Sequence, residues 1–170
     1  YLFGQTPASV VTGRNSQPFR WMLDRVQDAH GNAMTLTYAR DQEQLYPARI
    51  EYASHPGSGR AATQRVDFVL DETPRPDIES SYRHGGTTPI VTAKRLYFID
   101  MRTLVGGVWQ LVRRYEFVYT TSARTGRSLL TKLNMIGSNN ASRMTLSTFA
   151  YHAEDVPTYQ MTTADAPAAT

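Results

Sequence analysis

Residues 97–119 read Y-F-I-D-M-R-T-L-V-G-G-V-W-Q-L-V-R-R-Y-E-F-V-Y. Two runs rich in β-branched and aromatic residues flank the pair Gly106-Gly107, and this arrangement is typical of a tight β-hairpin. If the two glycines form the loop, one face of the hairpin carries the facing pairs Leu104/Trp109, Asp100/Arg113, Phe98/Tyr115 and Leu96/Phe117. Apolar, aromatic and oppositely charged pairs of this kind each stabilise a sheet by ~0.2–1 kcal/mol. The strongest signal in the chain therefore predicts a sheet and carries no catalytic motif.

The composition is that of one globular domain. The chain has 170 residues, of which 41% are hydrophobic and 19% are charged. This length is enough to bury a core without disulfides or metals. The 10 tyrosines and the many β-branched residues favour strands.

The charge and the lack of cysteine limit the possible chemistry. The net charge of +3 is a small excess of arginine, and acidic residues are interspersed with the basic ones. We therefore expect no nucleic-acid partner. A chain without cysteine has no disulfide, thiol nucleophile or Cys-ligated metal. No apolar stretch approaches the ~18–20 residues that span a bilayer, so we expect no direct membrane insertion.

Turn residues divide the rest of the chain into further strand-like runs. These runs are segments 20–27, 33–39, 46–53, 64–70, 129–136 and 143–152. Segment 129–136 also fits a helical turn with one apolar side, although a strand is favoured. With the long hairpin, the count is about eight or nine strands. This pattern predicts an all-β fold, either an antiparallel β-sandwich or an extended β-meander.

The remaining segments are less regular. Residues 1–4 are typical of the end of a strand whose partner lies upstream or outside this chain. Residues 5–18 and 71–89 are rich in loop-forming residues. From about residue 154, Pro, Ala and Thr dominate the sequence. We expect a β-rich domain over residues 1–153 and a flexible tail or linker over residues 154–170.

The turn between segments 20–27 and 33–39 reads D-A-H-G-N. Its Gly-Asn pair supplies the positive φ angles that a hairpin needs. One register faces Val26 with Met34, and a one-residue slip exchanges the two faces. Asp28 superficially resembles a calcium ligand, but the alternating acids of a calcium loop are missing. Asp28 is expected to hydrogen-bond to the backbone of its own turn.

Candidate catalytic and metal-binding residues are few. The acids Asp71, Glu72, Asp77 and Glu79 could support glycoside chemistry if two of them converged, but an Arg75–Asp77 ion pair that fixes the loop is the simpler interpretation. The serines lack a nucleophile-elbow context. The four histidines, His30, His55, His84 and His152, show no metal-ligand spacing. The sequence therefore predicts no catalytic, cofactor-binding or metal-binding residue.

Basic and aromatic residues alternate in the long hairpin, at Arg95, Tyr97, Arg113, Arg114 and Tyr115. Such a set could form a stacking and phosphate-binding platform. The hairpin register, however, divides these residues between opposite faces of the sheet. A structural role is therefore expected, with Arg113 facing Asp100.

The order of short motifs along the chain resembles a known family. The motifs are Phe3-Gly4, Trp21-Met22-Leu23, Val26-Gln27-Asp28, Gly31-Asn32, Tyr38, Ile50-Glu51-Tyr52, Val66-Asp67-Phe68, Arg75-Pro76-Asp77, Ser81-Tyr82-Arg83-His84-Gly85, Thr92, Arg95-Leu96, Ile99, Arg114-Tyr115, Tyr119 and Ser128-Leu129-Leu130. Over residues 1–136 the chain resembles the N-terminal region of the Salmonella virulence plasmid B-protein family. This region is shared with the B components of insecticidal toxin complexes and with Rhs-type toxin proteins. The chain departs from the family at Gly86, where a bulky residue is usual, and in a longer loop at residues 61–63.

The resemblance implies that residues 1–153 form a β-rich shell domain of a large secreted toxin protein. In that family, downstream repeats wrap into a hollow container that holds a C-terminal toxic enzyme. The matched residues then have turn, corner and core roles, and none is catalytic. The implied partners are other segments of the same large toxin protein or other toxin-complex subunits.

Three functions compete at this level. The favoured one is a noncatalytic structural segment, in which Trp21 and Trp109 anchor the packing. A carbohydrate-binding β-sandwich module is the alternative, and an exposed Trp or Tyr platform would favour it. A hydrolase or transferase would need convergent carboxylates with a shifted pKa in a pocket. We expect that the chain is not an enzyme.

Overall fold

The computed structural model describes residues 1–13, 16–82 and 89–152. It confirms the all-β prediction. The strands are β1 (Leu2–Phe3), β2 (Val10–Thr12), β3 (Pro18–Trp21), β4 (Leu23–Gln27), β5 (Ala33–Asp41), β6 (Gln44–Ser54), β7 (Gln64–Leu70), β8 (Glu79–Ser81), β9 (Ile90–Thr92), β10 (Leu96–Val105), β11 (Val108–Thr121), β12 (Ser128–Gly137) and β13 (Arg143–Thr148). Two short 3-10 helices, η1 (Pro7–Ser9) and η3 (Pro56–Ser58), lie between them. The expected tail, residues 154–170, lies outside the described residues.

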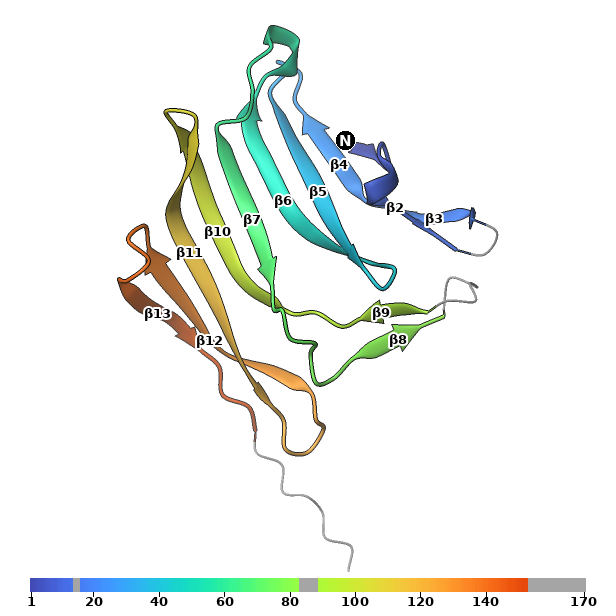
Figure 1. The fold of residues 1–170 in the computed structure, drawn as a ribbon, viewed down its shortest axis with the longest axis vertical. Helices are drawn as coiled ribbons and strands as arrows, with labels where there is room; N and C mark the ends of the chain where they lie inside the picture. The colour runs from blue at the N-terminus through green and yellow to red at the C-terminus, as the bar shows by residue number, and fades with distance from the viewer. Residues whose placement is uncertain (14–15, 83–88, 153–170) are drawn as a thin grey trace, which may run out of the picture.

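The main body is one antiparallel sheet of nine strands in the order β1-β4-β5-β6-β7-β10-β11-β12-β13 (Figure 1). Strands that follow one another in sequence are neighbours, apart from two excursions. The pairs β2-β3 and β8-β9 leave the sheet and form separate two-stranded sheets. Of the two predicted architectures, the extended meander is therefore the one found.

Several predicted elements are corrected by the pairing. The expected strand over residues 20–27 is two strands, because the chain turns from β3 into β4 at Met22, whose N–H donates to the Ser9 carbonyl at 2.8 Å. The partner of β1 is β4, within this chain and not upstream of it. The segments predicted as loops contain β2 and β8. Segment 129–136 is a strand, β12, and the helical alternative is wrong.

The long hairpin forms at Gly106-Gly107, where both glycines have positive φ, of 57° and 80°. Leu104 faces Trp109 as predicted. The register then shifts by one residue, because Val112 bulges out of β11 between Leu111 and Arg113. Asp100 consequently faces Arg114, and the predicted Asp100/Arg113 pair is wrong. The pairs predicted beyond this point are displaced in the same way, since a bulge adds one residue to one strand only.

The core of buried apolar side chains is small and lies at one end of the sheet. Val11, Leu45 and Ile90 are almost fully buried, and Phe19, Met22 and Tyr38 pack against them. This cluster joins β2, β6 and β9, so the two excursions pack against the main sheet there (Figure 1). Of the two registers left open for β4 and β5, the structure has the one that faces Val26 with Met34.

Candidate functional site: a charged sheet face and a polar clamp

One face of the main sheet carries a row of ion-paired side chains. The register places Arg49, Asp67, Asp100 and Arg114 next to one another on β6, β7, β10 and β11. Facing residues of an antiparallel pair point to the same side of a sheet. Arg65 and Arg102 face each other two residues along β7 and β10 and share this side. These six residues define the charged face.

Every carboxylate of the charged face contacts more than one guanidinium. Asp67 lies 2.7 Å from Arg49 and 2.9 Å from Arg65. Asp100, whose side chain is 1% exposed, accepts hydrogen bonds from Arg102 and from Arg114 at 2.7 Å. Because a buried carboxylate needs such partners, these arginines have a structural use.

Electrostatics at Asp100 are dominated by two opposing effects. Burial raises the pKa of this carboxyl, whereas the hydrogen bonds from Arg114 and Arg102 lower it, and the net effect is a lowered pKa. The same contact with Asp100 raises the pKa of Arg114. The pair is therefore charged at neutral pH.

The aromatic rings on this face are covered by arginine. Arg114 lies 4.2 Å from the centroid of the Phe98 ring, and Arg65 lies 4.7 Å from the centroid of the Trp109 ring. Cation–π contacts of this kind add ~0.5–1 kcal/mol at exposed sites. They also cover the aromatic faces, so these rings are not free to stack on a nucleic-acid base.

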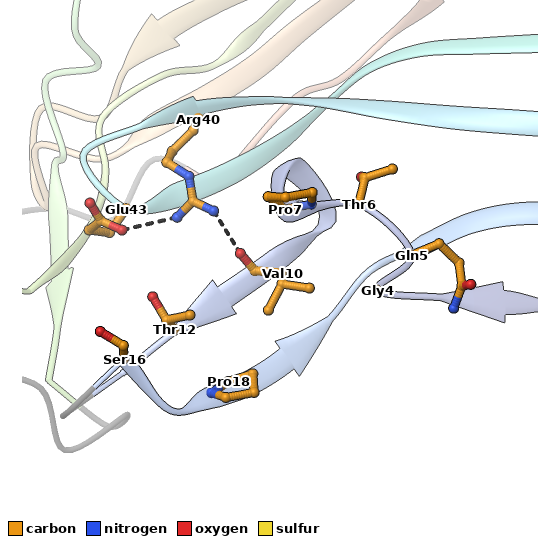
Figure 2. A pocket seen from close by; sticks show the side chains of 10 residues that line it. All are labelled: Gly4, Gln5, Thr6, Pro7, Val10, Thr12, Ser16, Pro18, Arg40 and Glu43. Atoms are coloured by element: carbon orange, nitrogen blue, oxygen red, sulfur yellow. Dashed lines mark hydrogen bonds and ion pairs between the residues drawn. The ribbon is translucent and has the colours of Figure 1, made fainter.

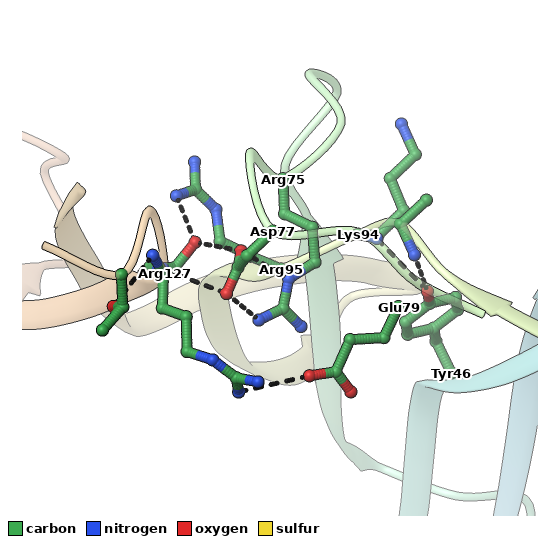
Figure 3. Close-up of polar contacts among 10 residues, drawn as sticks. Tyr46, Arg75, Asp77, Glu79, Lys94, Arg95 and Arg127 are labelled. Atoms are coloured by element: carbon green, nitrogen blue, oxygen red, sulfur yellow. Dashed lines mark hydrogen bonds and ion pairs between the residues drawn. The ribbon is translucent and has the colours of Figure 1, made fainter. Parts of the chain in front are cut away.

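A second polar network, here called the Asp77 clamp, joins the β7–β8 connection to the start of β12 (Figure 3). Asp77 accepts hydrogen bonds from the guanidinium of Arg75 at 2.9 and 2.8 Å. It also accepts the backbone N–H of Ser128 at 3.0 Å and its hydroxyl at 2.6 Å. The Arg75 hydrogen bonds, with those from Ser128, hold the pKa of Asp77 far below its usual range.

Arg95 links the clamp to its surroundings. Its guanidinium donates to the Ser128 hydroxyl at 3.2 Å, pairs with Asp71 at 2.9 Å and lies 4.9 Å from the centroid of the Tyr119 ring. This pairing lowers the pKa of Asp71. Nearby, the Tyr46 hydroxyl accepts the backbone N–H groups of Ala93 and Lys94 at 3.0 and 3.2 Å (Figure 3).

The predicted acid cluster does not form a pair of carboxylates. Asp77 pairs with Arg75 as predicted, Asp71 pairs with Arg95, and Glu79 pairs with Arg127 at 3.3 Å. The side chain of Lys94 donates to the Glu72 carbonyl at 2.6 Å. Each of the four acids therefore contacts a basic residue, Glu72 through its backbone carbonyl and the other three through their carboxylates. This arrangement is typical of a loop that is fixed by ion pairs.

A shallow, open cavity lies between the N-terminal segment and the β5-β6 turn (Figure 2). Its volume is about 660 Å³ and its charged lining residues are Arg40 and Glu43. These two pair at 3.0 Å, and Arg40 also donates to the Val10 carbonyl at 2.6 Å. The charged groups of the cavity are therefore engaged with the protein, and the cavity lacks a set of convergent polar groups aimed at a ligand.

His30 lies in the β4–β5 turn and His55 in the β6–β7 loop, whereas His152 follows the end of β13. The ring of His55 lies between the turn and the loop, with Nε2 2.9 Å from the His30 carbonyl and Nδ1 accepting the Ser58 N–H at 3.1 Å. This link joins the β4–β5 turn to the β6–β7 loop, and the sequence offered no signal for it. His84 lies outside the described residues. Within the described part of the chain, no group of three or more His, Cys, Asp or Glu could hold a metal ion.

Asp28 holds its turn as predicted. Its carboxylate accepts the N–H groups of His30 and Asn32, each at 2.9 Å, and the side-chain amide of Asn32 at 2.8 Å. The Asn32 side chain, with these backbone hydrogen bonds, lowers the pKa of Asp28. The turn is a local cap built from one carboxylate.

Both tryptophans were predicted to anchor the packing, and this is wrong for Trp21. Trp109 is partly buried under Arg65. Trp21 is 52% exposed and lies against Gly4, where an added Cβ would overlap the indole ring. Trp21 therefore packs against the residue that follows β1 and is not a core anchor.

The basic and aromatic residues of the hairpin divide between the two faces, as predicted, but with a changed partner. Arg114 lies on the charged face, and Arg113 points to the opposite side with its guanidinium 3.3 Å from the Tyr115 hydroxyl. A single platform of alternating rings and bases does not form. No helix among the described residues is long and apolar enough to cross a membrane.

Comparison with known proteins identifies the fold. No protein-family model and no curated protein matches the chain. The N-terminal domain of effector protein SpvB from Salmonella typhimurium strain LT2 matches with a TM-score of 0.66 at 14% identity, over 80% of this chain and 57% of that chain. The structure of TcdB2-TccC3-TEV matches with a TM-score of 0.69 at 19% identity, over 85% of this chain and 9% of that chain. TcdB2-TccC3 without its hypervariable C-terminal region matches with a TM-score of 0.66 at 17% identity, over 85% of this chain and 9% of that chain.

These likenesses confirm the fold, and they agree with the resemblance read from the sequence. The chain spans just over half of the SpvB domain and about a tenth of the TcdB2-TccC3 chains. Five of the residues that carry the sequence resemblance, Asp67, Arg75, Asp77, Arg114 and Ser128, belong to the charged face or to the Asp77 clamp. Part of the motif pattern therefore lies at contacts that hold strands and loops in place.

Proposed function

We propose that the chain is a noncatalytic structural segment of a large secreted Rhs-like or toxin-complex protein. In this proposal it forms part of a β shell that encapsulates or delivers a toxin domain. Its partners are other segments of the same protein or other toxin-complex subunits. The sheet supports this proposal, because its polar side chains hold strands and loops together and, among the described residues, β13 pairs on one side only.

The single observation that carries the proposal is the open edge at β13. All six residues of β13 are exposed, and β12 is its neighbour in the described sheet. Free-standing proteins usually protect an edge strand with Lys, Pro, a bulge or a covering loop. β13 has a bulge at Leu146, but its outer edge carries neither Lys nor Pro. An edge of this kind suits a sheet that continues into further strands.

The likeness to the SpvB domain and to TcdB2-TccC3 supports the same role. The aligned part of TcdB2-TccC3 is a small share of a much longer chain, and a segment of such a chain would have neighbours on both sides. Secretion follows from the proposed toxin role.

The test is a structure of the full-length gene product that contains this segment. We expect further strands to pair with β13, and the segment to form part of a wall around an enclosed space. A free-standing domain whose β13 edge faces solvent would contradict the proposal. So would turnover of a substrate by the purified segment that is lost when Asp77 or Glu79 is changed to the corresponding amide.

The exposure of Trp21 favours one second candidate, a carbohydrate-binding module. An exposed indole can stack on a sugar ring, and Trp21 is 52% exposed. A glycan-array screen of the wild type and of Trp21→Ala distinguishes the two candidates. Binding that is lost in Trp21→Ala favours the module, and the absence of binding to any glycan favours the structural segment.

A further inference from the structure

The charged face carries more positive than negative charge. Its six residues are four arginines and two aspartates. Asp67 alone lies within 3.2 Å of three guanidinium groups, those of Arg49, Arg65 and Arg102. Arg65 and Arg102 also face each other directly, and like charges in that position destabilise a sheet. The carboxylates of the face therefore leave part of its positive charge without a counterpart.

The neighbouring residues on the same side of the sheet do not remove this excess. The row that contains Arg114 continues to Arg143 on β13, and Arg143 pairs with Glu116 at 3.3 Å. In the other direction, the row that contains Arg65 continues to Glu51 on β6 and Arg25 on β4. Each extension adds one base and one acid, so the excess of positive charge is unchanged.

The acids lie deep in this side of the sheet, and the most exposed charges are positive. The side chains of Asp100 and Glu116 are 1% and 9% exposed. Those of Arg49 and Arg143 are 42% and 56% exposed. A molecule that approaches this side from solvent therefore meets guanidinium groups first.

Several guanidinium N–H groups on this side lack an acceptor among the described residues. Arg49 donates to Asp67 through Nε, and its two terminal nitrogens donate to no described residue. The Nε atoms of Arg65 and Arg102 are buried without a hydrogen-bond partner, although both lie near Asp67. A guanidinium has five N–H donors in a fork that fits a carboxylate. The side therefore offers donors for carboxylates that the described chain does not supply.

The shape and the aromatic contacts of this side favour a polypeptide partner over a nucleic acid. Arg114 and Arg65 cover the rings of Phe98 and Trp109, so these rings are not available to stack on bases. From Arg49 on β6 to Arg143 on β13 the row crosses five strand spacings, a distance of about 24 Å. An extended peptide of about seven residues covers that distance.

We propose that this side of the sheet binds an extended acidic segment of a partner polypeptide, whose carboxylates pair with Arg49, Arg143 and the arginines between them. The proposal goes beyond the proposed function and does not depend on it. Charge complementarity of this kind sets specificity and the rate of association more than affinity. We therefore expect a weak complex that forms at low salt and is lost as salt screens the charges.

The experiment measures the binding of a fluorescently labelled ten-residue glutamate peptide to the full chain by fluorescence anisotropy. Arg49→Gln and Arg143→Gln are each expected to weaken binding by about threefold, as for single exposed ion pairs. The two residues are far apart, so their effects should add and the double variant should bind about tenfold more weakly. Circular dichroism checks the fold, and Arg143→Gln at an exposed position keeps the test open if Arg49→Gln fails to fold.

Arg113→Gln is the matched control. Arg113 points to the opposite side of the sheet, with its guanidinium near the Tyr115 hydroxyl. Its loss changes the net charge of the chain by the same amount as the loss of Arg49 or Arg143. Binding of the peptide by Arg113→Gln is expected to stay within about twofold of the wild type, because long-range effects of one charge are screened by salt.

Four results would overturn the proposal. The first is that neither the wild type nor any variant binds the glutamate peptide at low salt. The second is equal weakening by Arg113→Gln and Arg49→Gln, which would leave net charge as the only cause. The third is tighter binding of a ten-nucleotide single-stranded DNA than of the peptide, with loss in the same variants, which would favour a nucleic acid.

The fourth result concerns the last residues of the chain itself. Residues 154–170 contain Glu154, Asp155 and Asp165 and neither Lys nor Arg. If this segment were the natural occupant, the wild type would not bind the peptide, and a variant with Glu154→Gln, Asp155→Asn and Asp165→Asn would bind it. Equal binding by the wild type and this triple variant supports a separate partner.

Discussion

Asp67 and Asp100 lie directly opposite each other on β7 and β10. Two facing carboxylates repel across a sheet, and here Arg102 lies between them, 3.2 Å from Asp67 and 2.7 Å from Asp100. Arg114 pairs with Asp100 from the neighbouring strand. The centre of the sheet is therefore joined by ion pairs on one side, where a small sandwich domain would place apolar contacts.

Loss of charge at Asp100 should destabilise the sheet strongly. Asp100→Asn leaves Arg114 and Arg102 without a buried carboxylate, and removal of one partner of a buried ion pair costs about 3–5 kcal/mol. We expect a decrease near the lower end of that range in the free energy of unfolding, because the arginines remain partly exposed. Urea denaturation followed by circular dichroism measures it. Glu43→Gln, which breaks the exposed Arg40–Glu43 pair, is the control and should cost less than about 1 kcal/mol.

Acid should destabilise the protein through Asp77. The pKa of this carboxyl is far below its value of about 3.9 in an unfolded chain. A lowered folded-state pKa contributes stability above the unfolded pKa, and this stability is lost as the pH falls toward the folded pKa. The free energy of unfolding should therefore decrease between about pH 5 and pH 2. In Asp77→Asn the stability at neutral pH should be lower and its decrease with acid shallower. An equal acid dependence in both proteins would show that Asp77 is not the cause.

Much of the sheet follows from local sequence. Gln64–Leu70 and the Gly106-Gly107 turn are found where the alternation of residues and the glycine pair predict them. The Arg75–Asp77 pair and the Asp28 turn were also predicted, because both partners lie within a few residues of each other. Short-range contacts of this kind are visible in a single sequence.

The parts that could not be predicted depend on a bulge inside the hairpin and on contacts between segments that are far apart in the sequence. A bulge at Val112 has no clear sequence signature, and both Arg113 and Arg114 could have faced Asp100. The link from His55 to the His30 carbonyl spans 25 residues and joins two loops. Trp21 was expected in the core because of its size, but the chain turns at the next residue and leaves the ring half-exposed.

The contact between Gly31 and His55 should make Gly31 difficult to replace. Gly31 has a φ of +88°, and an added Cβ would lie 2.7 Å from Nε2 of His55. Gly31→Ala is therefore expected to lower the free energy of unfolding by more than about 1 kcal/mol, from strain and from the overlap together. In the background of His55→Ala, the overlap is removed and only the strain remains. A double-mutant cycle by thermal denaturation measures the difference, and full additivity would contradict the contact.

The bulge at Val112 leads to a prediction about deletions. Because Leu111 faces Arg102 and Arg113 faces Met101, removal of Val112 leaves every facing pair of the hairpin unchanged. The deletion should therefore fold, with less local twist in β11, and should change the stability only slightly. Deletion of Tyr115 is the matched control, because it moves Glu116 to the side of the sheet opposite the charged face, across from Ile99, and shifts every pair beyond it. Circular dichroism and hydrogen exchange of the two deletions distinguish these outcomes, and equal loss of folding in both would show that the bulge is required for the sheet.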